Sequence, residues 1–401
     1  MSKDGINKVK GFEILTTNIG IKPGNKKNDF VLIKVLGDSV VSGVFTKNKF
    51  AAAPVIVAKQ NIKNDIKLLV INSGNANAGT GKKGLSDAKK INLELAKYLK
   101  ISPNQVLPFS TGVIMQHLPV EKIIKKINEI DLESSFENSW IDAAKAIMTT
   151  DTVQKISSSI LKITGENITL TGIAKGSGMI NPNMATMLGF IAMDVKISKT
   201  LLNALVKEVA DESFNLITVD GDTSTNDAFI IASSQLARNK KIVTKNTDYK
   251  KLKSELIKVA FNLASAIVRD GEGATKYVQI KIMNAKTRSE AMEVGKKIAN
   301  SPLVKTAFFA SDPNLGRILC SIGNASIKNL NLEKIKLFLN NLLVFEKGLV
   351  SKKYDESLAL KIMKKNQFSL TVDLKRGRET LTVLTTDFSY DYVKINAEYR
   401  S

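Results

Sequence analysis

The 401-residue chain contains one cysteine and one histidine, and these two scarcities exclude several kinds of chemistry. A single cysteine, Cys320, cannot form a disulfide within the chain and cannot hold zinc by itself, which fits a reducing compartment. The lone histidine, His117, has no serine or cysteine nucleophile motif beside it, so we expect neither a histidine-based triad nor a multi-histidine metal site. We interpret Cys320 as a small buried apolar residue and His117 as a structural or surface residue.

Long apolar runs and aromatic residues are also scarce. No segment reaches the ~18 uninterrupted apolar residues of a membrane span, and the first residues lack the apolar region of a signal peptide. We therefore expect a cytoplasmic protein with no membrane partner. The net charge is +21, but the lysines are scattered and aromatic residues make up only 6%, so we expect no nucleic-acid partner.

Apolar strand-like runs alternate with amphipathic helical patterns along the whole chain. Residues 30–35 and 67–72 have the pattern of strands, and a helix is predicted from about residue 86 to residue 100. The alternating segments 369–374 and 380–384 predict a β-hairpin. Further helices are predicted at 119–131, 199–211, 250–269, 285–299, 332–341 and 354–365. The fold class is therefore α/β, with helices packed on antiparallel or mixed sheets and enough chain for two or three lobes.

The most informative segment is residues 172–194, where the pair Ala185-Thr186 lies between an Asn-Pro-Asn turn and an apolar run. If the chain cut itself there, Thr186 would become an N-terminal residue that carries a nucleophilic hydroxyl and a basic amine. With histidine so scarce, an amine whose pKa is about 7.7–8.0 is the obvious base. An ordinary threonine at the start of a strand explains the same residues without cleavage.

Four polar loops that follow apolar runs offer further candidates. Ser110-Thr111-Gly112 supplies a hydroxyl and a glycine N–H, the parts of an oxyanion hole, although a turn before a helix explains it too. Residues 270–274 place a carboxylate in a glycine-rich turn that also suits a helix C-cap. Residues 72–79 and 220–227 are small and polar. The second of these loops lacks the glycine and glutamate positions of an EF-hand, so we expect no metal.

In combination, these motifs resemble the ornithine acetyltransferase family, also called glutamate N-acetyltransferases or arginine-biosynthesis bifunctional proteins. The likeness covers essentially the whole chain, through residues 44–48, 72–79, 110–112, 148–152, 175–188, 270–274, 301–307, 312–317 and 392–401. It implies self-cleavage between Ala185 and Thr186, giving an α fragment of residues 1–185 and a β fragment of residues 186–401 that stay associated and share sheets.

The resemblance also implies the reaction and its residues. Thr186 would accept the acetyl group of N-acetyl-L-ornithine and pass it to L-glutamate in a ping-pong cycle, with its own amine as general base. Glu272 would move protons or hold that amine, and Thr111 with Gly112 would stabilise the oxyanion. The implied substrate-binding residues are Thr149, Lys175, Thr186, Glu272, Asn396 and Ser401. No cofactor is implied; some family members also use acetyl-CoA as a substrate, and no residue here decides that point.

The family fold implied by the resemblance is an α/β sandwich with helices flanking two β-sheets, followed by a smaller α/β lobe. Such proteins usually assemble as two α and two β chains. The sequence departs from the family pattern at three positions: Met115 replaces a usual glycine, Leu315 a usual tryptophan, and Gly79 a frequent cysteine. No implied catalytic residue is lost.

Two other functions remain compatible with the residues. An autoprocessing amidase or aminopeptidase would use the same threonine, with water instead of glutamate resolving the acyl-enzyme. A basic, non-enzymatic binding protein would keep an intact chain and bind polyanions in a salt-sensitive way.

Overall fold

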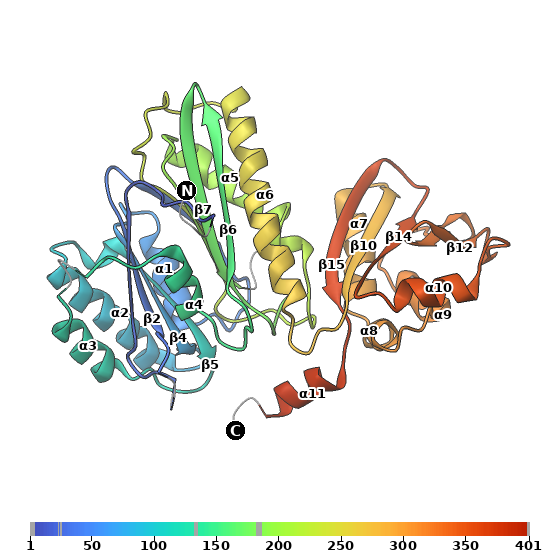
Figure 1. Ribbon diagram of the computed structural model, residues 1–401, viewed down its shortest axis with the longest axis horizontal. Helices are drawn as coiled ribbons and strands as arrows, with labels where there is room; N and C mark the ends of the chain where they lie inside the picture. Colours follow the sequence, from blue (N-terminus) through green and yellow to red (C-terminus); the bar gives the residue numbers. More distant parts are fainter. Residues whose placement is uncertain (1–4, 23, 25, 132–134, 182–186, 399–401) are drawn as a thin grey trace. The chain divides into compact units, whose positions relative to one another are not determined.

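The chain forms two compact units of mixed α and β structure (Figure 1). The computed structural model describes residues 5–22, 24, 26–131, 135–181 and 187–398. Unit 1 comprises Met1–Gly176, Pro182–Asn215 and Thr223–Ile267, and unit 2 comprises Ser177–Asn181, Leu216–Asp222 and Val268–Ser401. The chain therefore passes briefly into unit 2 twice before it enters that unit for good.

A four-stranded sheet in the order β1-β2-β4-β5 forms one layer of unit 1. Its strands are β1 (Phe12–Thr17), β2 (Phe30–Val35), β4 (Leu68–Asn75) and β5 (Val106–Val113), of which only the β4–β5 pair is parallel. Two helices, α2 (Gly81–Tyr98) and α3 (Val120–Glu129), bury Leu95 and Ile123 in one apolar cluster with Leu32 and Leu68 of the sheet. One face of this sheet is thus covered by helices.

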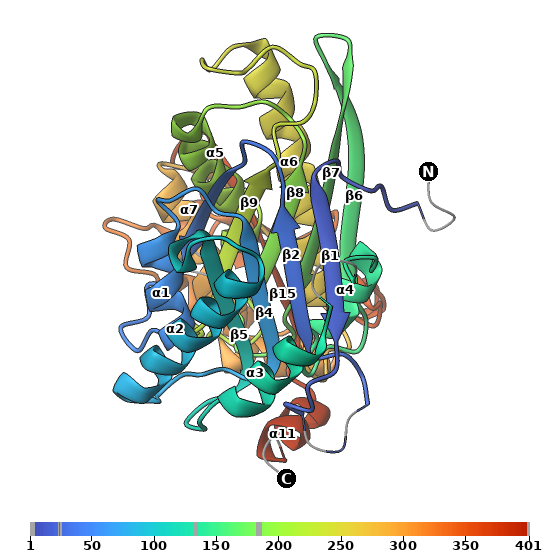
Figure 2. The ribbon, with the colours of Figure 1, turned by 90° about the vertical axis from the view of Figure 1, so that its left-hand side faces the viewer.

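A five-stranded sheet in the order β3-β9-β8-β7-β6 forms the second layer. Its strands are β3 (Val40–Phe45), β6 (Lys155–Ile163), β7 (Glu166–Lys175), β8 (Leu188–Met193) and β9 (Ala228–Ser233). The two sheets share a core in which the rings of Phe109 and Phe190 lie 5.0 Å apart, edge to face. Figure 2 shows the sheets as adjacent layers.

The described part of unit 1 also contains the helices α1 (Ala53–Asn61), α4 (Trp140–Ala146), α5 (Lys199–Asp211) and α6 (Thr247–Arg269), the last of which continues into unit 2. A Cβ at Gly172 of β7 would lie within 3.3 Å of both Val259 and Leu263, so α6 packs tightly on the second sheet. The predicted sandwich with flanking helices is confirmed.

Unit 2 contains a six-stranded sheet in the order β13-β12-β11-β14-β10-β15. The strands are β10 (Tyr277–Ala285), β11 (Lys336–Leu339), β12 (Leu342–Glu346), β13 (Leu349–Val350), β14 (Gln367–Asp373) and β15 (Glu379–Thr386). The helices are α7 (Arg288–Ala299), α8 (Pro302–Phe309), α9 (Leu315–Gly323), α10 (Glu356–Met363) and α11 (Tyr390–Ala397). Short 3-10 turns occur along the whole chain, at Pro103–Gln105, Phe214–Leu216 and Leu332–Lys334.

Three predictions from the sequence are wrong. β14 and β15 do not form a hairpin, because β10 lies between them and pairs with both. The helix predicted over 332–341 is a 3-10 turn followed by β11, in which Leu337 and Leu339 alternate toward the core. Cys320 is exposed, since it lies on the outer side of α9. Apolar spacing identifies a strand or helix but selects neither its partner nor its orientation.

Candidate active site

The segment Ser110-Thr111-Gly112 lies where β5 runs beside the end of β4. In this parallel pair Thr111 lies opposite Ser73 and Gly112 lies opposite Gly74. The φ of Gly112 is 129°, and a Cβ there would lie 2.2 Å from the carbonyl carbon of Gly74. Only glycine permits so close an approach of two backbones in this conformation.

Two of the polar loops found in the sequence hold this segment in place. Ser110 Oγ donates to Asn72 Oδ1 at 2.5 Å. From the other loop, Asn226 Nδ2 donates to Ser110 O at 2.9 Å and to Ala76 O at 2.6 Å, and all of these contacts are buried. The loops around 72–79 and 223–227 therefore support the backbone around Thr111.

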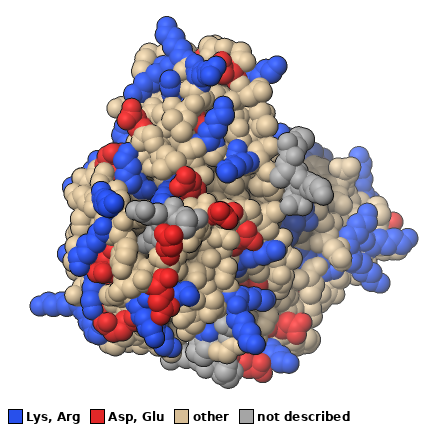
Figure 3. All heavy atoms as spheres, turned by 60° about the vertical axis from the view of Figure 1, so that its left-hand side comes forward, with Lys and Arg blue, Asp and Glu red and all other residues tan. Residues whose placement is uncertain are grey.

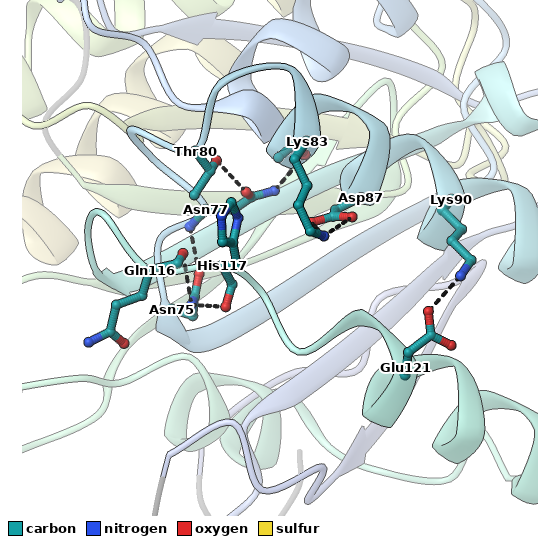
Figure 4. A network of polar contacts seen from close by, with 10 residues as sticks. Asn75, Asn77, Thr80, Lys83, Asp87, Lys90, Gln116, His117 and Glu121 are labelled. Atoms are coloured by element: carbon teal, nitrogen blue, oxygen red, sulfur yellow. Dashed lines mark hydrogen bonds and ion pairs between the residues drawn. The ribbon is translucent and has the colours of Figure 1, made fainter.

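Figure 4 shows how the same network continues to the chain that follows β5. Asn75 Nδ2 donates to the carbonyl oxygens of Gln116 and His117, at 3.3 and 3.2 Å, while Asn75 Oδ1 accepts the N–H of Asn77 at 2.8 Å. His117 is exposed and contributes its backbone carbonyl to this network. It is thus a surface residue, as predicted.

Asp151 organises a buried ionic cluster in unit 1. Its Oδ1 accepts hydrogen bonds from Lys155 Nζ at 2.6 Å and from the N–H of Gly176 at 2.7 Å. Its Oδ2 accepts the N–H of Thr149 at 3.0 Å and lies 4.0 Å from Lys175 Nζ. Burial by itself would raise the pKa of Asp151, but the ammonium groups of Lys175 and Lys155 hold it well below its ordinary value. The carboxylate is therefore ionised and positions both Thr149 and the chain after Lys175.

Lys175 connects this cluster to β5. Its Nζ donates to Thr111 Oγ1 at 3.1 Å, and the contact is buried. The structure therefore brings together, within unit 1, four residues that the sequence singled out: Thr111, Gly112, Thr149 and Lys175.

Sequence reasoning assigned no role to Asp151 or to Asp227. Asp227 is 2% exposed, its Oδ2 has no hydrogen-bond partner among the described residues, and burial raises its pKa well above the ordinary value. The sequence could have indicated a role for Asp151, because it lies two residues after Thr149, a predicted substrate-binding residue. No pattern in the sequence indicates that Asp227 is buried, because a polar loop normally faces solvent.

In unit 2, the other two described candidates form a hydrogen-bonded pair. Asn396 Nδ2 of α11 donates to Glu272 Oε2 at 2.9 Å. The Glu272 carboxylate lies against Gly178, where a Cβ would be 2.2 Å from Oε2, and the N–H of Glu272 donates to Ser177 O at 2.9 Å. Gly273 has a φ of 64° and lies against the backbone at the start of α11. Unit 2 thus presents a carboxylate and an amide, fixed by close backbone packing.

Three candidates, Ala185, Thr186 and Ser401, lie outside the described residues and stay predictions. Within the described part of the chain, no group of three or more His, Cys, Asp or Glu side chains could hold a metal ion. No helix in that part is long and apolar enough to cross a membrane. On the face seen in Figure 3, lysines and arginines are interspersed with acidic and uncharged residues.

Comparison with known proteins decides the family. The model of the ArgJ family matches residues 13–401. The chain belongs to the ArgJ family. Arginine biosynthesis bifunctional proteins ArgJ from Neisseria meningitidis serogroup A and Colwellia psychrerythraea are 48% and 45% identical to it, over 98% of this chain and 96% of each relative. The chain is therefore an enzyme of arginine biosynthesis.

A solved structure of this ArgJ family agrees with the fold. The crystal structure of arginine biosynthesis bifunctional protein ArgJ from Bacillus halodurans matches with a TM-score of 0.50 and 34% identity. The match covers 98% of that solved chain but only 52% of the present one. About half of this protein therefore aligns with nearly the whole of that solved chain.

Proposed function

We propose that this protein transfers the acetyl group of N-acetyl-L-ornithine to L-glutamate through an acetyl ester on Thr186, after cleavage between Ala185 and Thr186. The hydroxyl of Thr186 attacks the acetamide carbonyl, and its proton passes through the Thr186 amine to the leaving α-nitrogen of ornithine. The amine of glutamate then attacks the ester, and the threonine hydroxyl regains its proton. No cofactor takes part.

The hydrogen bond between Lys175 and Thr111 is the main observation that supports this proposal. Because the Thr111 hydroxyl accepts a hydrogen bond from the Lys175 ammonium, its own proton is available to donate to another oxygen. An adjacent positive charge strengthens such a donor. We assign this hydroxyl, with the Gly112 N–H, to the oxyanion of the tetrahedral intermediate, a contact worth about 3–4 kcal/mol in other enzymes.

The substrates have one feature in common, an α-carboxylate, and Lys175 with Thr149 is its proposed site. Asp151 supports both residues, since it accepts the N–H of Thr149 and lies near the Lys175 ammonium. In unit 2, Glu272 and Asn396 keep their proposed roles in proton transfer and substrate binding, and Ser401 keeps its role in binding.

The described residues on each side of the proposed cleavage site are hydrogen-bonded within their own units. Upstream, Asp220 accepts the N–H groups of Met179 and Ile180, at 2.6 and 2.9 Å. Downstream, Met187 O accepts the N–H of Ala228 at 2.9 Å, and β8 follows at once.

The fragments would remain together because they share a sheet. β8, from the proposed β fragment, pairs with β7, from the α fragment, over six residues in the middle of the five-stranded sheet. The half-length solved chain from Bacillus halodurans also agrees with a cut near the middle. We propose that two α and two β fragments form a heterotetramer that acts in the cytoplasm.

Intact-mass measurement of the purified chain beside the variants Thr186→Ala and Thr186→Ser tests the cleavage. We expect two fragments from the wild type and from Thr186→Ser, the larger beginning at residue 186, and one uncut chain from Thr186→Ala. A wild-type chain that stays intact through purification and incubation would overturn the mechanism.

Release of ornithine from N-acetyl-L-ornithine tests the transfer itself. Turnover should depend on added L-glutamate and yield N-acetyl-L-glutamate in equal amount. Turnover that ignores glutamate and yields acetate would instead identify an amidase, and no turnover from a cleaved protein would contradict the proposed substrates. Replacing the donor by acetyl-CoA in the same assay decides whether acetyl-CoA is also a substrate.

A further inference from the structure

Gly178 lies directly against the carboxylate to which the proposed reaction assigns proton transfer. A Cβ at Gly178 would lie 2.2 Å from Glu272 Oε2, 2.4 Å from Cδ and 2.6 Å from Oε1. The same oxygen, Oε2, accepts the hydrogen bond of Asn396 Nδ2 at 2.9 Å. The carboxylate therefore occupies the space that a side chain at position 178 would need, and it makes its bond to Asn396 from there.

The conflict at position 178 involves the Glu272 carboxyl group and no backbone strain. The φ of Gly178 lies outside the left-handed region that favours glycine. The three atoms nearest to an added Cβ all belong to the carboxyl group, which ends a flexible side chain. An alanine at position 178 would thus suit the backbone and would displace the carboxylate.

The backbone on both sides of Gly178 is held within unit 2. Ser177 O accepts the N–H of Glu272 at 2.9 Å. Asp220 Oδ2 accepts the N–H of Met179 at 2.6 Å. The peptide groups that flank Gly178 are therefore both hydrogen-bonded, so Gly178 has a fixed position relative to Glu272.

The next two residues of this segment are anchored as well. Ile180 O accepts the N–H of Val219 at 2.7 Å. Asn181 Nδ2 donates to Gly221 O at 2.8 Å, and Asn181 Oδ1 accepts from Lys296 Nζ at 3.0 Å. Hydrogen bonds thus hold the segment Ser177–Asn181 along its whole length.

The segment and its partners fall on opposite sides of the proposed cut. Ser177–Asn181 belongs to the proposed α fragment, whereas the rest of unit 2, Leu216–Asp222 and Val268–Ser401, belongs to the β fragment. None of the hydrogen bonds that anchor the segment involves Ala185 or Thr186. Cleavage would therefore leave Gly178 bound beside Glu272.

We propose that Gly178 is a positioning residue for Glu272, supplied by the α fragment to the β fragment. This inference rests on the proposed function, in which Glu272 moves protons or holds the Thr186 amine. A carboxylate in either role must lie within hydrogen-bond reach of the group it serves, so the reaction rate depends on its position. The missing side chain at position 178 leaves the carboxylate the position from which it bonds to Asn396.

The first test compares fully cleaved Gly178→Ala protein with the wild type. We expect kcat for acetyl transfer to fall about tenfold, because the methyl group displaces the carboxylate. The midpoint of urea unfolding should stay close to that of the wild type, because the methyl group meets only the end of one side chain. Loss of rate without loss of stability is a result that a merely structural role would not give.

Gly295→Ala is the matched control. Gly295 lies in α7 of unit 2 and also has no left-handed φ, and a Cβ there would lie 2.7 Å from Cγ2 of Val383, which is fully buried. A β-branched side chain in the core has little freedom to move aside, so this variant should unfold at lower urea concentration. Its folded form should keep the wild-type kcat.

A second test places Gly178→Ala in a protein that also carries Glu272→Ala. Glu272→Ala removes the three atoms that an alanine at position 178 would meet. Gly178→Ala should therefore slow single-turnover release of ornithine about tenfold when Glu272 is present and less than about twofold when it is absent. This difference isolates the part of the effect that acts through the carboxylate.

The proposal is overturned if Gly178→Ala keeps the wild-type kcat, if it slows both backgrounds by the same factor, or if the variant fails to fold or to cleave. Full activity of Glu272→Ala would overturn it as well, by contradicting the proposed role of Glu272. A cleaved wild type that transfers no acetyl group to glutamate would instead remove the proposed function itself, before any variant is compared.

Discussion

Gly79 and Met115 illustrate how single residues depend on each other at the margin of the proposed site. Both depart from the family pattern, and a Cβ at Gly79 would lie 2.3 Å from Met115 Sδ. Met115 has a φ of 62° and is exposed, so it occupies a left-handed conformation that favours glycine. The methionine side chain thus fills the space that a side chain at position 79 would need.

We therefore expect the stability effects of substitutions at these two positions to be coupled. Met115→Gly should stabilise the protein by about 1 kcal/mol, because it relieves the left-handed conformation. Gly79→Ala should destabilise it, and the cost should be about 1 kcal/mol smaller when Met115→Gly is also present. Urea unfolding of the two single variants and the double variant measures this coupling, and strictly additive free energies would contradict the contact.

At the scale of elements, the position of α11 depends on one glycine. A Cβ at Gly273 would lie 2.3 Å from the backbone nitrogen of Tyr392, and Ser389 Oγ donates to Gly273 O at 2.6 Å. The same helix supplies Asn396 to Glu272. Any side chain at position 273 must therefore displace the helix that holds Asn396 in place.

Gly273→Ala should lower kcat/KM for the proposed acetyl transfer about tenfold, through the loss of the Asn396–Glu272 contact. Gly348→Ala is the matched control, since Gly348 has a φ of 77° in the same unit but its nearest neighbour, Glu333 Cγ, is 3.4 Å from the added Cβ. Both variants bear a left-handed alanine, which costs about 1–2 kcal/mol. Steady-state kinetics should separate them, and equal activity of the two folded variants would disprove the role of α11.

The sheet of unit 2 shows why strands were easier to predict from the sequence than the strands that pair with them. The alternating segments after residue 366 are strands, as their period indicates, but the strand between them comes from residues 277–285. The segment 336–339 is too short to distinguish the apolar spacing of a helix from the alternation of a strand. Pairing across a hundred residues is decided by packing that a local pattern does not contain.

At the scale of the whole molecule, buried lysines make stability depend on pH. Burial lowers the pKa of Lys305 to about 7, even though Asp387 and Asp220 act in the opposite direction. The Lys305 ammonium is fully enclosed and donates to Thr385 Oγ1 at 3.1 Å and to Thr386 O. Burial likewise lowers the pKa of Lys296 to about 7.

Between pH 7 and the pKa of an unfolded lysine, about 10.4, the unfolded chain binds a proton at Lys305 that the folded chain has released. The free energy of unfolding should therefore rise with pH in this window, by up to about 1.4 kcal/mol per pH unit for one proton. Lys305→Met should reduce that slope. Urea unfolding of Thr186→Ala protein at pH 7, 8 and 9 measures it, with exposed Lys364→Met as control; an unchanged slope for Lys305→Met would contradict the prediction.

The sequence by itself determined the fold class, the family and the residue types available for chemistry. The scarcity of histidine and cysteine excluded the usual bases and metal sites, and the motif around Lys175 and Thr111 indicated the family because those features depend on residue identity in order along the chain. Most helices were also predictable from the sequence, because the spacing of apolar residues that marks a helix lies within the helix itself.

Only the tertiary structure decided which of these residues lie together. Asp151 bridges Thr149, Lys155 and the chain after Lys175, and Lys22 packs behind Gly74, more than fifty residues away in sequence. Such contacts arise where strands meet and backbones pack through glycine, and their strength depends on burial. Burial and the proximity of charges are properties of the folded chain, so no local pattern of residues could have supplied them.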